Sequence, residues 1–164
     1  MFACEHENVH PDAMILGKAL GGGFYPVSAL VGKEHLMGVF NPGSHGSTFG
    51  GNPLAAALGL RALELMEENR LAEHSAELGA YFMEQLKTIK SPAIQEIRGM
   101  GLWIGIVVDP SIISARKVCE NLMNHGVLSK ETHETVVRLA PPLVITKEEL
   151  DWGIERIRLV LEGL

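Results

Sequence analysis

The sequence predicts a mixed α/β and α+β fold, in which residues 1–65 end one domain and residues 66–164 form a small α+β domain. Residues 1–52 are rich in Gly, Pro, His and Asn, which is typical of short strands and loops. Helical periodicity begins after residue 52, and beyond residue 93 pairs of expected strands alternate with helices. We therefore expect the domain boundary near residues 60–70, inside or just after the first long helix.

In the first part, the apolar runs Met14–Leu16 and Val27–Val31 predict two short strands, and residues 42–52 predict a loop. Asn52 is a good helix cap, and Pro53 suits the first helical turn because it needs no amide hydrogen there. Apolar residues then follow at helical spacing, at Leu54, Leu58, Ala62, Leu65 and Met66.

In the second part, Leu71–Lys90 predicts a helix that Ser91-Pro92 ends. Four strands are expected, at residues 94–97, 102–108, 127–129 and 135–139. Residues 114–125 predict a further helix with Gly126 as its C-terminal cap. Thr146 and Glu149 form a T-x-x-E capping box that opens the last helix.

Composition and residue spacing argue against several classes of function. The formal net charge is -6 over 164 residues with no basic block, which disfavours nucleic acid and anionic membranes as partners. The sequence shows neither a membrane-length apolar run nor a signal-peptide pattern, and we expect a cytoplasmic protein. Cys4 and Cys119 are expected as free thiols, and no residue spacing predicts a metal site. Because candidate chemistry lies so near Met1, we expect a piece of a longer polypeptide.

Lys18 is the first candidate for chemistry. It follows an apolar run and precedes three glycines, Gly21–Gly23, which let a ligand or a backbone approach closely. Desolvation at a strand end would free its amine as a nucleophile. Alternatively, Lys18 extends to solvent before a flexible turn.

Residues 43–53 are the second candidate, with Ser47 and Thr48 among glycines directly before a helix start. Hydroxyl groups, exposed amides and a helix dipole suit an anion such as phosphate. The same residues also fit an ordinary glycine-rich connection.

Arg138 is the third candidate, a single arginine in the apolar run Val136–Leu139. Its planar guanidinium suits a carboxylate bound through two hydrogen bonds. By simple strand alternation, however, Arg138 would face solvent while Val137 and Leu139 face the core.

Four segments in order resemble the class III aminotransferases, enzymes of pyridoxal-phosphate (PLP) fold type I: Pro11–Gly23, Gly46–Pro53, Arg98–Leu102 and Val137–Leu143. The resemblance covers essentially the whole chain, and it implies the end of the large PLP-binding domain followed by the small C-terminal domain. It also implies amino acid and 2-oxo acid substrates and a homo-oligomer, a dimer or higher.

The resemblance further implies roles for single residues. Lys18 would hold PLP covalently and act as the general base, and Ser47 and Thr48 would bind the phosphate of the neighbouring subunit's PLP. Arg138 would pair with a carboxylate of the enzyme when the site is free and bind an α-carboxylate of the dicarboxylic substrate. Arg98 would be structural, closing a turn between two strands. Asp12 does not match the family's aspartate at the pyridine nitrogen, which has no counterpart in this chain.

Residues 41–49 and 129–135 resemble the branch of the family that acts on ornithine and 2-oxoglutarate. Members acting on N-acetylornithine share the lysine and the Gly-Gly-Asn-Pro segment, and they remain an alternative. A second alternative is that the isolated chain is a catalytically incomplete domain, because the pyridine-nitrogen partner and the phosphate-binding loop are missing from it. A non-catalytic sensor of PLP or amino acids is a third, less favoured interpretation.

Overall fold

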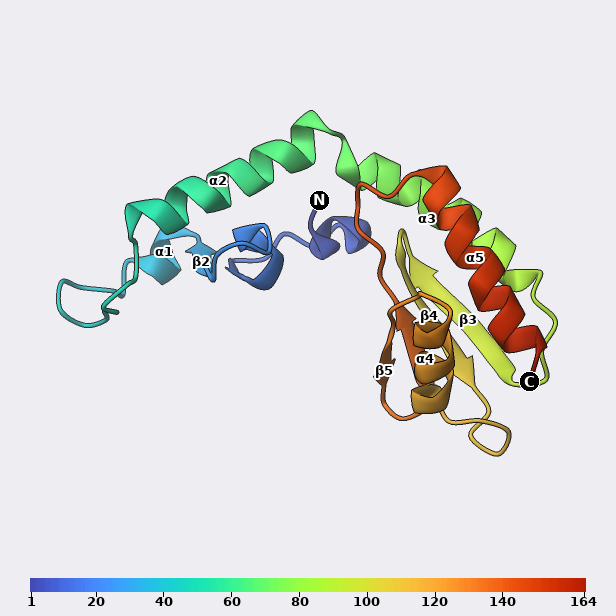
Figure 1. The fold of residues 1–164 in the computed structure, drawn as a ribbon. Helices are drawn as coiled ribbons and strands as arrows, with labels where there is room; N and C mark the ends of the chain where they lie inside the picture. Colours follow the sequence, from blue (N-terminus) through green and yellow to red (C-terminus); the bar gives the residue numbers. More distant parts are fainter. The chain divides into compact units, whose positions relative to one another are not determined.

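The computed structural model describes residues 1–164, which form two compact units, Met1–Arg70 and Leu71–Leu164 (Figure 1). Each unit mixes helices and strands. No helix of the chain combines the length and the apolar character that crossing a bilayer requires.

The first unit contains a two-stranded antiparallel sheet and one long helix. Its elements are η1 (Ala3–Glu7), β1 (Ala13–Leu16), η2 (Lys18–Gly21), β2 (Ala29–Gly32), α1 (Glu34–Met37) and α2 (Pro53–Glu68). Helix α2 begins as the sequence predicts, because the Asn52 side chain accepts a hydrogen bond of 2.9 Å from the Ala55 amide.

The first unit buries few side chains. Ile15 on β1 is 86% exposed and Phe24 is 83% exposed, although both are large and apolar. An isolated two-stranded sheet is marginally stable in water. The stability of this unit therefore rests largely on the packing of α2, where Gly59 lies against Leu20.

The second unit contains a four-stranded antiparallel sheet in the order β3-β4-β6-β5, with three helices. Its elements are α3 (Leu71–Lys87), β3 (Ile94–Met100), β4 (Trp103–Val108), α4 (Ala115–Asn124), β5 (Lys130–Thr132), β6 (Val136–Leu139) and α5 (Lys147–Glu162). The capping box predicted at Thr146 and Glu149 is confirmed, with both reciprocal hydrogen bonds present.

The predicted strand at residues 127–129 is wrong, and the strand is Lys130–Thr132 instead. Gly126 has a left-handed φ of 84°, and the amides of Gly126 and Val127 bond to the carbonyls of Met123 and Leu122. This pair of bonds ends helix α4 in a Schellman motif, as the predicted glycine cap requires. Residues 126 and 127 thus belong to the helix end, and the strand begins only at Lys130.

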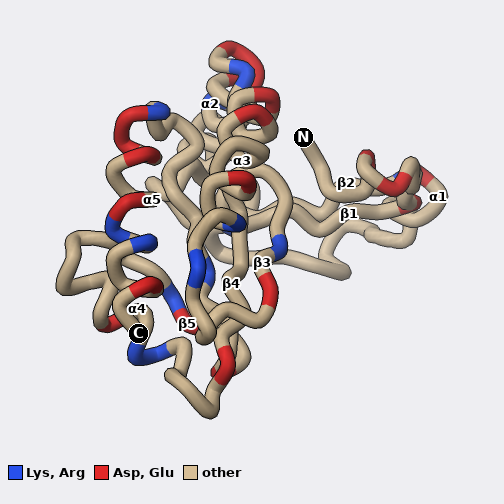
Figure 2. Tube along the Cα trace, turned by 90° about the vertical axis from the view of Figure 1, so that its right-hand side faces the viewer, with Lys and Arg blue, Asp and Glu red and all other residues tan.

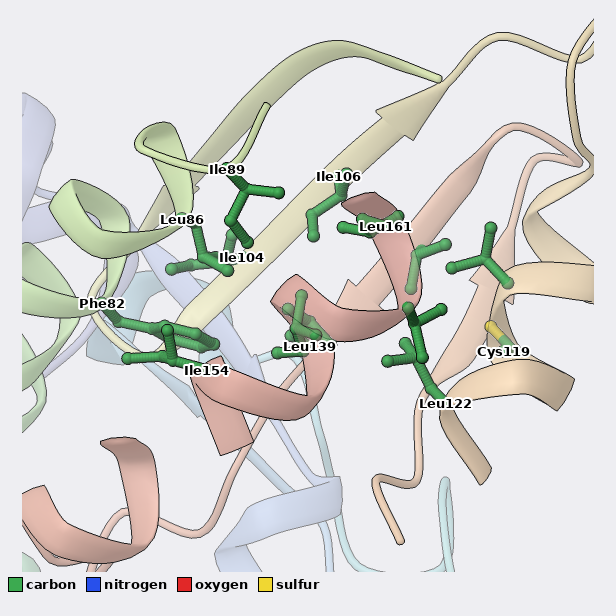
Figure 3. Packing of buried hydrophobic residues seen from close by; sticks show 14 of the residues in the cluster. Phe82, Leu86, Ile89, Ile104, Ile106, Cys119, Leu122, Leu139, Ile154 and Leu161 are labelled. Carbon is green, nitrogen blue, oxygen red and sulfur yellow. The ribbon is translucent and has the colours of Figure 1, made fainter. Parts of the chain in front are cut away.

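The core of the second unit lies on one face of its sheet (Figure 3). On β4 the side chains alternate, so that Ile104, Ile106 and Val108 are buried while Trp103 lies on the opposite face and is exposed. The core also takes side chains from all three helices, among them Phe82, Leu86, Val118, Leu122, Ile154, Ile157 and Leu161. The helices therefore cover one face of the sheet and leave the other open.

Two close contacts fix α3 against the turn between β3 and β4. A Cβ atom added at Gly79 would lie 2.1 Å from the carbonyl carbon of Gly101, so only glycine fits there. The Ser75 hydroxyl accepts a hydrogen bond of 3.1 Å from the Leu102 amide. Since Gly101 has a φ of 55°, both sides of this contact depend on glycine.

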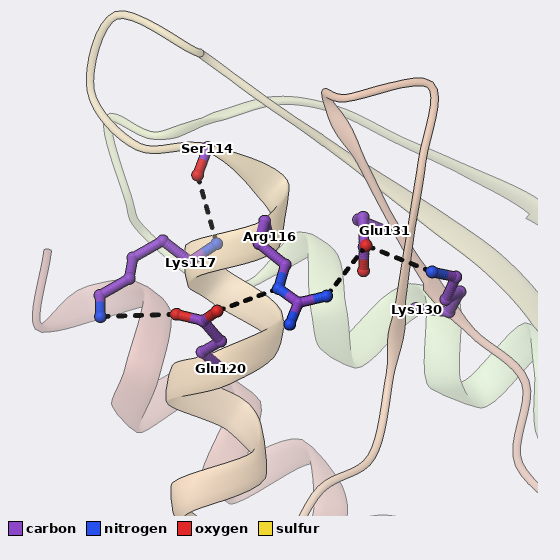
Figure 4. A network of polar contacts seen from close by, with 6 residues as sticks. All are labelled: Ser114, Arg116, Lys117, Glu120, Lys130 and Glu131. Atoms are coloured by element: carbon purple, nitrogen blue, oxygen red, sulfur yellow. Dashed lines mark hydrogen bonds and ion pairs between the residues drawn. The ribbon is translucent and has the colours of Figure 1, made fainter.

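A network of exposed charges links α4 to the edge strand β5 (Figure 4). Arg116 pairs with Glu120 at 2.9 Å on its own helix and with Glu131 at 3.3 Å on β5. Lys130 in turn pairs with Glu131 at 3.2 Å. Exposed pairs of this kind contribute little to stability. They do pair charged side chains of α4 with charged side chains of the edge strand β5.

Candidate functional site

Lys18 lies directly after β1, at the first residue of η2. Its φ is 51°, a left-handed conformation that costs a residue with a side chain about 1–2 kcal/mol. The side chain is exposed, so the desolvation that the apolar run predicted is not found. Its ammonium has no hydrogen-bond or ion-pair partner, and it borders a hollow of about 320 Å³ with Pro26, Val27 and Ser28.

Ser47 and Thr48 lie on the exposed loop before α2. The Ser47 hydroxyl accepts a hydrogen bond of 3.1 Å from the Gly50 amide, and the Thr48 hydroxyl has no partner. Ser47 lines a second hollow of about 300 Å³, which shares Pro26, Val27 and Ser28 with the hollow beside Lys18. The first unit thus brings Lys18 and Ser47 to adjoining hollows. Thr48 directly follows Ser47 in the chain.

Asp12 is engaged elsewhere in the first unit. Its carboxylate pairs with the Lys33 ammonium at 2.6 Å, and both side chains are exposed. The Lys33 amide also donates to the Asp12 carbonyl oxygen at 2.9 Å. Asp12 therefore ties the start of β1 to the end of β2.

Arg138 belongs to the second unit, where it lies on β6 between the buried residues Val137 and Leu139. Strand alternation thus places its side chain on the open face of the sheet. It lines a hollow of about 380 Å³ together with Arg98 and Trp103. Figure 2 shows lysine and arginine on the strands of this sheet.

The prediction that Arg98 closes a turn is wrong. Arg98 lies within β3, opposite Gly105 of β4, and the turn follows later at Gly101 and Leu102. Gly105 is in turn opposite Arg138 of β6. The participation of Arg98 and Trp103 in the hollow was missed, because it depends on strand register and no local motif indicates it.

Cys4 is partly buried and Cys119 is buried, and both are free thiols. No three His, Cys, Asp or Glu side chains are grouped as metal ligands.

The comparisons with known proteins define the class. The model of the family described as aminotransferase class-III matches residues 1–161, and the chain belongs to this family. The chain is 58% identical over 164 residues to the ornithine aminotransferase of Geobacillus sp. (strain WCH70), a match that covers 100% of this chain and 40% of that protein. The chain thus spans about two fifths of the length of the curated relatives it matches.

Solved structures agree with this assignment and confirm the mixed fold. An ornithine aminotransferase from Toxoplasma gondii matches 98% of this chain with a TM-score of 0.94 and 43% identity, over 38% of its own chain. That structure is described as having partial occupancy of PLP at its active site. An acetylornithine aminotransferase from Elizabethkingia anophelis matches 99% of this chain with a TM-score of 0.91 and 43% identity, over 43% of its own chain.

Proposed function

We propose that this chain supplies the cofactor-binding lysine and a carboxylate-binding arginine of a PLP-dependent ornithine aminotransferase. The reaction moves the δ-amino group of ornithine to 2-oxoglutarate and yields glutamate 5-semialdehyde and glutamate. The observation that carries the proposal is the unpaired amine of Lys18, held after β1 in a left-handed backbone beside an open hollow. Family membership over residues 1–161 and relatives of that name support it.

The residues present fit the cofactor. An exposed amine without a partner is free to attach to an aldehyde, and the adjoining hollow gives room beside it. When bound, PLP supplies an electron sink for the carbon that carries the amino group. Once its amine is free again, Lys18 would move a proton at that carbon through its Nζ as a general base.

The loop before α2 offers groups for a phosphate. The Thr48 hydroxyl has no partner in the chain, and Ser47 lies at the adjoining hollow. The start of α2 adds the positive end of a helix dipole. We propose that both hydroxyls bind the phosphate of the PLP held by the neighbouring subunit, so that the working enzyme is a homodimer in the cytoplasm.

The two parts of the chain have different tasks in this proposal. Residues 1–65 belong to the large PLP-binding domain and carry Lys18, Ser47 and Thr48, whereas residues 66–164 form the small domain and carry Arg138. Arg138 binds a carboxylate of the dicarboxylic substrate through its planar fork. Since the chain spans about two fifths of its relatives, we expect the isolated 164 residues to be inactive in transamination.

An absorbance titration of the 164-residue chain with PLP tests the proposal, followed by borohydride reduction and peptide mapping. We expect a saturable band and a reduced adduct on Lys18. Lys18→Ala should remove the adduct, whereas Lys33→Ala, which breaks only the pair with Asp12, should keep it. Labelling spread evenly over several lysines would contradict the proposed role of Lys18.

The acetylornithine aminotransferase of Elizabethkingia anophelis supports a second candidate substrate, N-acetylornithine. A chimera decides between the two, in which these 164 residues replace the matching part of the Geobacillus ornithine aminotransferase. We expect the chimera to retain activity with ornithine and to lose it with Lys18→Ala. A shift of preference to N-acetylornithine would favour the second candidate.

A further inference from the structure

The second unit contains a hollow of about 370 Å³ on the side of its sheet that the helices cover. We call it the α5 hollow, because α5 borders it. Four of its lining side chains belong to the buried core, and each is at most 3% exposed: Phe82, Leu139, Leu150 and Ile157. Figure 3 labels Phe82 and Leu139 within that core. The α5 hollow therefore extends from the surface into the core.

A glycine inside a helix keeps the α5 hollow open. Gly153 lies within α5, although glycine is poorly suited to a helix interior. No atom lies within 4 Å of a Cβ added there, so close packing does not require glycine at this position. Gly153 does line the hollow, and a long side chain there would occupy part of its space. The structural effect of this glycine is therefore an open hollow.

The walls of the α5 hollow suit an apolar ligand better than water. Pro141 and Pro142 line it and carry no amide hydrogen to donate. Ordered water needs about two to four polar partners, and an apolar group gains affinity by displacing water that lacks them. An apolar cavity of about 150 Å³ holds one benzene molecule. The α5 hollow thus has room for an aromatic ring with a short chain.

The charge of the α5 hollow favours a cation. Glu149 is exposed and is the one charged residue of the lining. Its Oε2 accepts a hydrogen bond of 2.9 Å from the amide of the helix cap, and its Oε1 has no partner. The basic residues of the same end of α5 are already paired, Lys147 with Asp151 and Arg156 with Glu155. A ligand with a positive group would therefore find a free carboxylate oxygen at this hollow.

We propose that the α5 hollow binds a small amine that carries an aromatic ring on a short chain. The ring enters the hollow, where Phe82 and Trp152 offer aromatic contacts, and the ammonium pairs with Glu149. None of the residues proposed for transamination lines this hollow. The α5 hollow is thus a second binding site, separate from Lys18 and Arg138.

The test is a fluorescence titration of the full 164-residue chain carrying Trp103→Phe, without PLP and at constant salt. The chain has two tryptophans, so Trp152 in the lining then gives the whole indole signal. The ligand is 2-phenylethylamine, compared with 2-phenylethanol, which has the same size and no charge. We expect both to bind, and the amine to bind about threefold more tightly, the effect of one exposed charge pair.

Three variants separate the charge from the space. Glu149→Gln keeps the capping box, because glutamine also serves at that position, and should reduce the affinity for the amine to that for the alcohol. Glu148→Gln is the matched control, since Glu148 is an exposed carboxylate of the same turn that does not line the hollow. It should keep the preference for the amine. Gly153→Leu fills space in the hollow and should weaken binding of both ligands by about tenfold.

Four results would overturn the proposal: no saturable signal with the amine, equal affinity for amine and alcohol, a preference that survives Glu149→Gln, or unchanged binding in Gly153→Leu. Circular dichroism checks that each variant is folded, and Glu149→Gln decides alone if Gly153→Leu does not fold. Trapping of PLP on Lys18 takes place in the first unit and involves none of these residues. A failed amine titration with intact trapping therefore rejects the second site alone.

Discussion

At the scale of single residues, Gly79 shows how tightly α3 meets the sheet. Because an added Cβ would lie 2.1 Å from a backbone atom of Gly101, Gly79→Ala must push the helix away from the turn. Overpacking costs typically ~1–3 kcal/mol, while alanine favours the helix by about 1 kcal/mol. The clash is with backbone atoms, so the overpacking cost lies at the upper end of that range, about 3 kcal/mol. We therefore expect Gly79→Ala to lower the free energy of unfolding by a net of about 2 kcal/mol, measured by urea denaturation.

Gly153 in α5 provides the matched control for this substitution. No atom lies within 4 Å of a Cβ added there, so only the helix propensity changes. Gly153→Ala should therefore raise the free energy of unfolding by roughly 0.5–1 kcal/mol. Equal effects of the two substitutions would show that the contact between α3 and the turn does not constrain the fold.

Asp151 links stability to pH at the same scale. Hydrogen bonds from Lys147 at 2.7 Å and from the Tyr81 hydroxyl at 2.5 Å hold the pKa of its carboxyl below the ordinary value of 3.8. A lowered pKa in the folded state adds stability above the unfolded pKa, and this stability is lost as the pH falls through the folded pKa. Denaturation midpoints should therefore decline below about pH 4.

Asp151→Asn should reduce the decline of the denaturation midpoint at acid pH, because the amide carries no titrating proton. Glu148→Gln is the control, because Glu148 is an exposed carboxylate of the same helix with no ion-pair partner. It should leave the slope unchanged. An identical pH dependence in the Asp151→Asn variant would mean that other carboxyl groups cause the decline.

At the scale of elements, the capping box of α5 connects a sequence motif to the stability of a helix. Thr146→Ala removes the hydroxyl that accepts from the Glu149 amide at 3.2 Å. We expect a loss of about 1 kcal/mol in the free energy of unfolding, whereas Thr146→Ser should lose less because it keeps the hydroxyl. Thermal unfolding followed by circular dichroism measures both, and equal losses would contradict the capping role.

Much of the secondary structure was predictable because its signals are local. Asn52, Ser114 and Thr146 each cap a helix that periodicity also indicates. The strand expected at residues 127–129 failed because the Schellman motif at Gly126 uses the next amide to end α4. The one-turn elements η1, η2 and α1 were not predicted, since a single turn is too short for periodicity.

The candidate residues could be found only in part. Apolar runs and glycines indicated Lys18, Ser47, Thr48 and Arg138, and their proposed roles remain predictions. Gly105 brings Arg98 and Arg138 into line across three strands, and α4 and β5 separate β6 from the β3–β4 hairpin in the sequence. Register of this kind depends on the whole sheet, so a local pattern cannot reveal it.

At the scale of the whole molecule, the two units differ in how well they protect their chain. The first leaves Ile15, Leu30 and Val31 of its strands exposed, while the second buries a continuous core. We expect limited proteolysis of the monomeric chain to cut residues 1–52 well before residues 94–160, because local opening there costs less. Peptide mapping over time checks this, and equal protection of the two ranges would contradict it.

The left-handed backbone of Lys18 has a consequence for directed evolution. A library selected for heat resistance alone would drift towards glycine or asparagine at position 18, since both adopt a φ of 51° at lower cost. A library selected for chemistry would retain the lysine and leave the strain in place. Position 18 is therefore where thermostability and activity should trade against each other most directly in this chain.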